Sequence, residues 1–85
     1  MSKVDIYTSP LCGYCHMAKR LLTSKGVQFT EINVMGDDLA RAKMVQRAPG
    51  SRTVPQIFIG DLHVGGSDEL HAMDRAGKLD TLLAA

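Results

Sequence analysis

The chain has 85 residues, of which 45% are hydrophobic and 22% charged, and its ten Lys and Arg against nine Asp and Glu give a formal net charge of +1. Because a chain this short has room for one hydrophobic core, we expect residues 1–85 to form a single domain. The charges are scattered and no apolar run reaches the roughly 20 residues of a membrane span, which argues against nucleic acid or a membrane as a partner.

The first predicted elements are a strand and a helix. Residues 3–7 alternate polar and apolar side chains, which predicts a strand, and Ser9-Pro10 ends it. A helix is expected to follow and to end at Gly26. Its buried stripe is predicted from apolar side chains that recur at spacings of three and four residues: Leu11, Cys15, Ala18 and Leu22.

A second strand and a second helix come next. Residues 27–34 have strand composition, and Asp37 or Asp38 can cap a helix that Pro49-Gly50 ends. The apolar stripe predicted for this helix consists of Ala40, Met44, Val45 and Ala48. A helix that connects two strands implies a right-handed crossover, so we expect the first two strands to be parallel.

The rest of the chain predicts a hairpin and further helix. Ile57–Ile59 and Leu62–Val64 flank Gly60-Asp61, and a glycine at the first central position suits a type II′ turn between antiparallel strands. A helix is expected over residues 68–76, capped by Ser67 or Asp68, with a final helical turn after it. The order β-α-β-α-β-β-α predicts an α/β fold with a four-stranded mixed β-sheet flanked by helices.

Two cysteines lie where the first strand meets the first helix, in Cys12-Gly13-Tyr14-Cys15. Cys12 falls at the helix N-terminus, where free N–H groups and the helix dipole favour a thiolate that can act as a nucleophile. Cys15 lies one turn further and is shielded, which suits a resolving thiol. Residues 1–11 lack the pattern of a secretory signal, so we expect a cytoplasmic protein with reduced, catalytic cysteines.

The cysteine pair has three other interpretations. Cys12 to His16 also spells C-x-x-C-H, the attachment pattern of c-type haem, but such chains are exported and a strand leading into the motif does not suit a small helical cytochrome. Zinc would need His63 and His71, whose separation exceeds the usual ligand spacing, and His16 is expected to face solvent. Two buried, inert thiols are the third interpretation.

Two further segments complete a family pattern. Thr53-Val54-Pro55 precedes the third strand, and Gly65-Gly66-Ser67-Asp68 precedes the helix after the hairpin. Together with the cysteine motif, in this order and spacing, they resemble the glutaredoxins, a branch of the thioredoxin-fold oxidoreductases. The resemblance covers nearly the whole chain, and it is closest to the small bacterial dithiol glutaredoxins.

The resemblance implies a thioredoxin-like fold and a glutathione-dependent thiol–disulfide oxidoreductase. Cys12 would attack protein disulfides or glutathione–protein mixed disulfides, Cys15 would resolve the mixed disulfide formed with a protein disulfide, and glutathione would serve as reductant. Without a bound cluster, we expect the protein to be a monomer. It also implies a cis Val54–Pro55 bond, with the Val54 backbone pairing with the cysteine of glutathione. The residues that would bind glutathione are Tyr14, Thr53, Val54, Pro55, Gln56, Gly66, Ser67 and Asp68.

Within that set, Gln56 resembles the family residue that reaches the glycyl carboxylate. The γ-glutamyl head would lie on Gly66, Ser67 and Asp68, where free N–H groups favour a carboxylate and the Asp68 side chain can receive the ammonium. Tyr14 would line the groove near the glutathione sulfur.

The chain departs from the family pattern at two positions. Ser9 stands where the family often has a lysine, and Arg52 or Lys19 could replace that positive charge. Gly13 stands where proline is commoner, and related glutaredoxins without that proline include carriers of a [2Fe-2S] cluster bridged between two subunits. A dimeric cluster carrier, with Cys12 and glutathione as ligands, is therefore one alternative, and a redoxin reduced by thioredoxin reductase is another.

Overall fold

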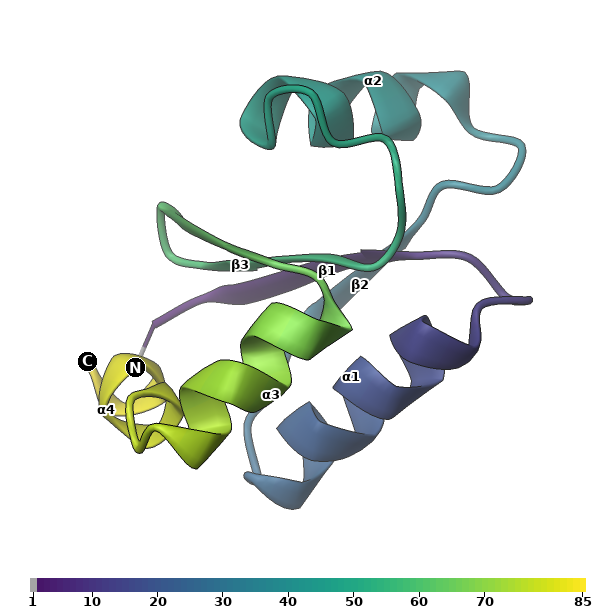
Figure 1. Ribbon diagram of the computed structural model, residues 1–85. Helices are drawn as coiled ribbons and strands as arrows, with labels where there is room; N and C mark the ends of the chain where they lie inside the picture. The colour runs from purple at the N-terminus through teal and green to yellow at the C-terminus, as the bar shows by residue number, and fades with distance from the viewer. Residues whose placement is uncertain (1) are drawn as a thin grey trace.

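A four-stranded mixed sheet runs through the middle of the protein, and helices cover both of its faces (Figure 1). The computed structural model describes residues 2–85. Its elements are β1 (Val4–Thr8), α1 (Gly13–Ser24), β2 (Thr30–Asn33), α2 (Asp38–Arg47), β3 (Gln56–Ile59), β4 (Leu62–Gly65), α3 (Ser67–Arg75) and α4 (Leu79–Ala84). The strands lie in the order β2-β1-β3-β4, with β1 and β2 parallel and the other neighbours antiparallel. This confirms the predicted fold class.

The two faces of the sheet carry separate cores. In Figure 1, α2 lies on one face, and α1 and α3 lie together on the other, with α4 beside the chain ends. The larger core, on the side of α1 and α3, consists of Val4, Ile6, Ala18, Leu22, Ile57, Ile59, Val64, Leu70, Leu79 and Leu83. The smaller core, under α2, consists of Tyr7, Val34, Met44, Ala48 and Phe58. Since β1 contributes to both, all five of its residues are buried.

Helix α1 follows the predicted stripe with one correction. Cys15, Ala18 and Leu22 are fully buried, but Leu11 is 88% exposed. The helix begins at Gly13, so Leu11 lies in the preceding loop, where the helical spacing no longer determines which way a side chain points. Leu11 instead leaves an apolar side chain on the surface beside Cys12.

The second strand is shorter than predicted. Only Thr30–Asn33 pairs with β1, whereas the sequence indicated a strand over residues 27–34. Val27 and Phe29 instead pack partly buried against the larger core from the loop after α1. β2 is an edge strand, and its last link to β1 is the hydrogen bond from the Val34 N–H to the Thr8 carbonyl oxygen (2.9 Å).

The hairpin agrees with the prediction, while the start of α3 differs from it. Gly60 has φ of 58° and no non-glycine residue among those described has positive φ, as expected for a type II′ turn. The N-cap of α3 is Gly66 and not Ser67 or Asp68, because the helix begins one residue earlier than predicted. Across the described residues, no helix is long and apolar enough to cross a membrane.

Candidate active site

Cys12 is the N-cap residue of α1. Its extended backbone (φ −108°, ψ 109°) turns the sulfur toward the first turn, where Sγ accepts a hydrogen bond from the Cys15 N–H at 3.1 Å. The first turn contains no acidic side chain that would oppose a negative charge. A backbone donor and the positive end of the helix dipole therefore both act on this sulfur.

Cys15 lies in the opposite environment. Its side chain is fully buried, and this burial raises the pKa of its thiol from 9.0 to about 12. A hydrogen bond with Cys12 acts in the same direction, while the Ser9 backbone and the Lys19 ammonium pull the pKa down. The Cys15 thiol therefore stays protonated near neutral pH and is a poor nucleophile there.

A polar network holds Lys19, one turn after Cys15. The Lys19 Nζ lies 2.9 Å from Oε2 of Glu31, and the same oxygen accepts a hydrogen bond from Thr8 Oγ1 at 2.7 Å. The Thr8 hydrogen bond and then the Lys19 contact lower the pKa of Glu31, so its carboxylate stays charged. The network fixes the positive charge of Lys19 near the buried Cys15 thiol. Lys19 is one of the two residues that could replace the lysine common in the family, and here it is paired with Glu31.

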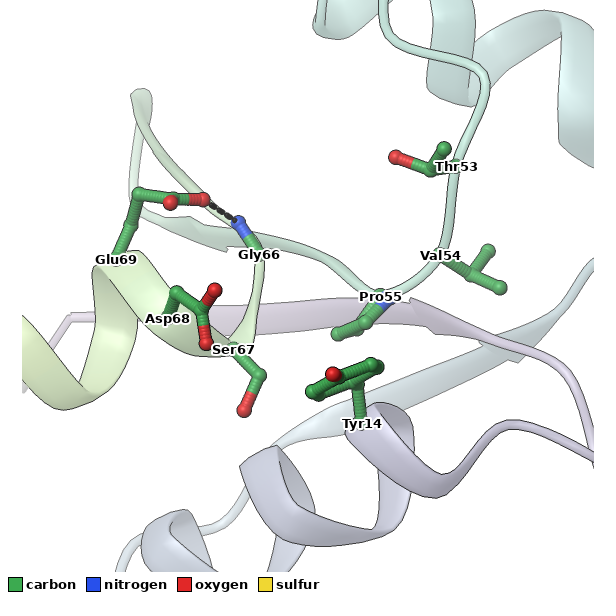
Figure 2. Close-up of a pocket in the computed structure, with 8 residues that line it drawn as sticks. All are labelled: Tyr14, Thr53, Val54, Pro55, Gly66, Ser67, Asp68 and Glu69. Atoms are coloured by element: carbon green, nitrogen blue, oxygen red, sulfur yellow. Dashed lines mark hydrogen bonds between the residues drawn. The ribbon is translucent and has the colours of Figure 1, made fainter.

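Next to the cysteines is a cavity of about 290 Å³ (Figure 2). Seven of the eight residues expected to bind glutathione line it: Tyr14, Thr53, Val54, Pro55, Gly66, Ser67 and Asp68. They come from α1, from the loop before β3 and from the start of α3. Cys12 is tied to the wall of this cavity, since its Sγ donates to the Val54 carbonyl oxygen at 3.6 Å. The Val54–Pro55 bond is cis, which confirms that expectation.

The start of α3 forms one wall of the cavity. Figure 2 shows Ser67 and Asp68 on this side, with the Tyr14 ring below Pro55 on the other. The first N–H groups of a helix have no intrahelical partner, so those of Ser67 and Asp68 are available to an anion.

Glu69, which is not among the predicted site residues, also lines the cavity. Its Oε1 accepts a hydrogen bond from the Gly66 N–H at 2.7 Å, so this N–H is already occupied. Gly65 has φ of 116°, and a Cβ there would lie 2.8 Å from the same Glu69 oxygen. A helix that begins with Gly followed three residues later by Glu is the signal that could have revealed this contact.

Gln56 is the one expected residue that does not line the cavity. Its side chain lies on the α2 face of the sheet, like that of Phe58, since residues two apart in a strand share a face. Gln56 is only 4% exposed, and its Nε2 donates to the Thr53 carbonyl oxygen at 3.0 Å. Gln56 thus supports the cavity wall from behind.

The comparisons with known proteins agree with this geometry. The family model described as Glutaredoxin matches residues 4–64. The chain belongs to the glutaredoxin family. It is 56% identical over 85 residues to a glutaredoxin of Pseudomonas aeruginosa, covering all of both chains, and 52% identical over 83 residues to Glutaredoxin 3 of Escherichia coli K12, covering 98% and 99%. The crystal structure of the buckwheat glutaredoxin–glutathione complex matches with a TM-score of 0.87 at 32% identity, covering 98% of this chain and 77% of that one.

Family membership assigns the coarse activity and the fold. This glutaredoxin is a thiol–disulfide oxidoreductase with a thioredoxin-like fold, and its redox pair is Cys12 and Cys15. In residues 2–85, no group of three or more His, Cys, Asp or Glu side chains is placed to hold a metal ion.

Proposed function

We propose that residues 1–85 form one glutaredoxin domain that acts in the cytoplasm, as a monomer, as a glutathione-dependent reductant of protein disulfides and of glutathionylated proteins. The observation that carries the proposal is the contact between Cys12 Sγ and the Val54 carbonyl oxygen, 3.6 Å apart. This contact puts the nucleophile at the wall of a cavity that ends at an open helix N-terminus. A peptide thiol with a carboxylate head matches that arrangement.

Each part of glutathione has a partner in this proposal. The Val54 backbone pairs with the cysteinyl residue, as an added strand would, and Tyr14 flanks the sulfur. The N–H groups of Ser67 and Asp68 receive the γ-glutamyl carboxylate, and the Asp68 carboxylate receives the adjacent ammonium. Arg52, which precedes Thr53, receives the glycyl carboxylate, since Lys19 is paired with Glu31.

The chemistry is a sequence of thiol–disulfide exchanges. With a glutathionylated protein, the Cys12 thiolate attacks the glutathione sulfur, the protein sulfur leaves as a thiolate that takes up a proton, and a Cys12–glutathione disulfide remains. The thiolate of a second glutathione then attacks that disulfide, which releases glutathione disulfide and regenerates Cys12. With a protein disulfide, Cys15 displaces the bound substrate, and two glutathiones reduce the resulting Cys12–Cys15 disulfide.

Gly13, which replaces the commoner proline, favours a second candidate function. In this candidate, a dimer carries a [2Fe-2S] cluster on Cys12 of each chain and on two glutathiones. A cluster carrier would give a coloured dimer when reconstituted anaerobically with iron, sulfide and glutathione. A colourless monomer in that experiment would contradict it. Rapid reduction by thioredoxin reductase and NADPH, with none by glutathione, would instead support the reductase-fed alternative.

The experiment that tests the leading proposal compares two mixed disulfides of one peptide, one with glutathione and one with free cysteine. Both contain the same sulfur chemistry, but only the first offers the γ-glutamyl and glycyl groups. We expect a higher kcat/KM for the glutathionylated peptide by at least about tenfold, which corresponds to about 1.4 kcal/mol of added binding in the transition state. Equal values for the two peptides would overturn the proposed glutathione site.

A further inference from the structure

The Gln56 side chain bridges two residues that are ten positions apart in the sequence. Its Nε2 lies 3.0 Å from the Thr53 carbonyl oxygen and 3.4 Å from Thr53 Oγ1, while its Oε1 lies 2.7 Å from His63 Nε2. A carbonyl oxygen can only accept, so the amide nitrogen must face Thr53 and the amide oxygen must face His63. His63 Nε2 therefore carries a hydrogen and donates a hydrogen bond to Gln56 Oε1.

His63 is itself held in place on the α2 face. Its ring stacks on Phe58, with ring centroids 4.9 Å apart and planes 26° from parallel, and Phe58 pairs with His63 across β3 and β4. The Arg47 guanidinium lies 4.1 Å from the centre of the Phe58 ring. The imidazole thus has a defined orientation, although His63 is exposed on the surface.

The pair connects the two strands that carry the two walls of the cavity. Thr53, Val54 and Pro55 lead directly into β3, where Gln56 is the first residue. His63 lies in β4, which runs into the segment from Gly66 to Asp68. Two hydrogen bonds, from His63 to Gln56 and from Gln56 to Thr53, therefore link the wall formed by Thr53–Pro55 to β4, the strand that leads into the opposite wall.

We propose that Gln56 and His63 are positioning residues for the glutathione site. The proposal rests on the proposed function and deepens it. The amide nitrogen of Gln56 holds Thr53, and His63 holds the amide oxygen at the other end of the same group. The backbone of Val54, the next residue, is thereby presented to the cysteinyl part of the ligand. Neither side chain contacts the reacting sulfurs or the γ-glutamyl head.

Loss of either partner has a defined consequence. Without Gln56, the Thr53 carbonyl oxygen loses its only hydrogen-bond donor within the described residues. Without His63, the amide oxygen of Gln56 loses its hydrogen-bond donor, so the side chain is held only at its nitrogen end. In both cases the segment before Pro55 samples more conformations, and ligand binding must restore the order, which weakens binding.

The test measures KM and kcat for the glutathionylated and the cysteinylated peptide with His63→Leu, Gln56→Met and the double variant. We expect each single change to raise KM for the glutathionylated peptide about fivefold, the effect of one lost hydrogen bond of about 1 kcal/mol. For the His63 variant, kcat should match wild type with both peptides, and KM should rise for both, because both offer a cysteinyl residue to the Val54 backbone. Because the pair acts as one unit, the double variant should be no worse than either single variant.

His63→Gln is the matched rescue variant, because a glutamine amide N–H can replace the Nε2 donor at nearly the same reach. It should restore the wild-type KM. Unchanged KM in His63→Leu, or a lowered kcat and melting temperature that His63→Gln does not restore, would overturn the positioning role. A wild-type protein that does not distinguish the two peptides would overturn the proposed function itself, which the variants alone cannot do.

Discussion

Cys12 and Cys15 lie one turn apart on α1, and their surroundings differ in almost every property that controls a thiol. Cys12 is the N-cap, is partly exposed and accepts a backbone hydrogen bond at 3.1 Å. Cys15 is fully buried, and its pKa is raised to about 12. Because both residues are cysteines, the difference shows that position in the helix, and not residue type, makes Cys12 the attacking thiol and Cys15 the resolving thiol in the proposed mechanism.

The largest effect is expected when the partly exposed sulfur of Cys12 is removed. Cys12→Ser should lower kcat/KM for both protein disulfides and glutathionylated peptides by on the order of a thousandfold or more, because no other described thiol is exposed enough to attack. The measurement is steady-state reduction of insulin and of a glutathionylated peptide by glutathione. Residual activity in which Cys15 attacks the substrate would contradict the assignment of Cys12 as the attacking thiol.

The next prediction concerns the pH dependence of alkylation. A raised pKa means a smaller thiolate fraction at a given pH: at pH 9, a thiol of pKa about 12 is on the order of a thousandth ionised, whereas an ordinary thiol is half ionised. Burial is the largest cause of this raised pKa and remains in the folded Cys12→Ser protein, although the contribution of Cys12 itself is lost. Iodoacetamide should therefore modify Cys15 there at least about tenfold more slowly than in the same protein unfolded in urea. Mass spectrometry of timed samples provides the rates, and equal rates would show that burial does not protect Cys15.

A smaller effect is expected from the charge near Cys15. Lys19→Met removes a cation that lowers the Cys15 pKa, so this pKa should rise further and the resolving thiolate should become scarcer. We expect the reduction of a protein disulfide to slow by about three- to tenfold, while reduction of a glutathionylated peptide stays unchanged. Lys43→Met, an exposed change on α2, is the control. A loss of both activities in Lys19→Met would assign Lys19 to the fold and not to Cys15.

The smallest effect concerns Arg52, an exposed residue directly before Thr53. Arg52→Ala should raise KM for glutathione about two- to fivefold, because an exposed ion pair contributes about 0.2–1 kcal/mol, and high salt should reduce the difference. Arg75→Ala, an exposed change at the end of α3, is the matched control. An unchanged KM in Arg52→Ala would leave the glycyl carboxylate without a protein cation.

Local patterns predicted most of this structure. The element order and the Cys12 position follow from periodicity, turn residues and caps, which are properties of neighbouring residues. Asp5 shows the limit of local patterns. It occupies a polar position in an alternating strand but is buried, because both faces of β1 are covered. Its Oδ2 lies 3.2 Å from Nη1 of Arg47. No local pattern reports which distant residue covers a strand.

The candidate site shows the same limit. The family resemblance implied the residues that line the cavity, but it also placed Gln56 among them. Its actual contacts depend on which face of β3 it occupies and on the pairing of β3 with β4, which bring it to His63. Leu11 differs from prediction for a smaller reason, since a shift of the helix start to Gly13 removes it from the buried stripe.

The most direct test of the central claim is the reduction of a glutathionylated peptide by Cys15→Ser, with glutathione as the only reductant. If Cys12 alone performs the attack and the cavity holds glutathione, this variant should keep wild-type turnover with the glutathionylated peptide while losing the reduction of a protein disulfide. Complete loss of deglutathionylation in Cys15→Ser would contradict the account, because it would make the buried thiol necessary for a reaction that here requires only the exposed one.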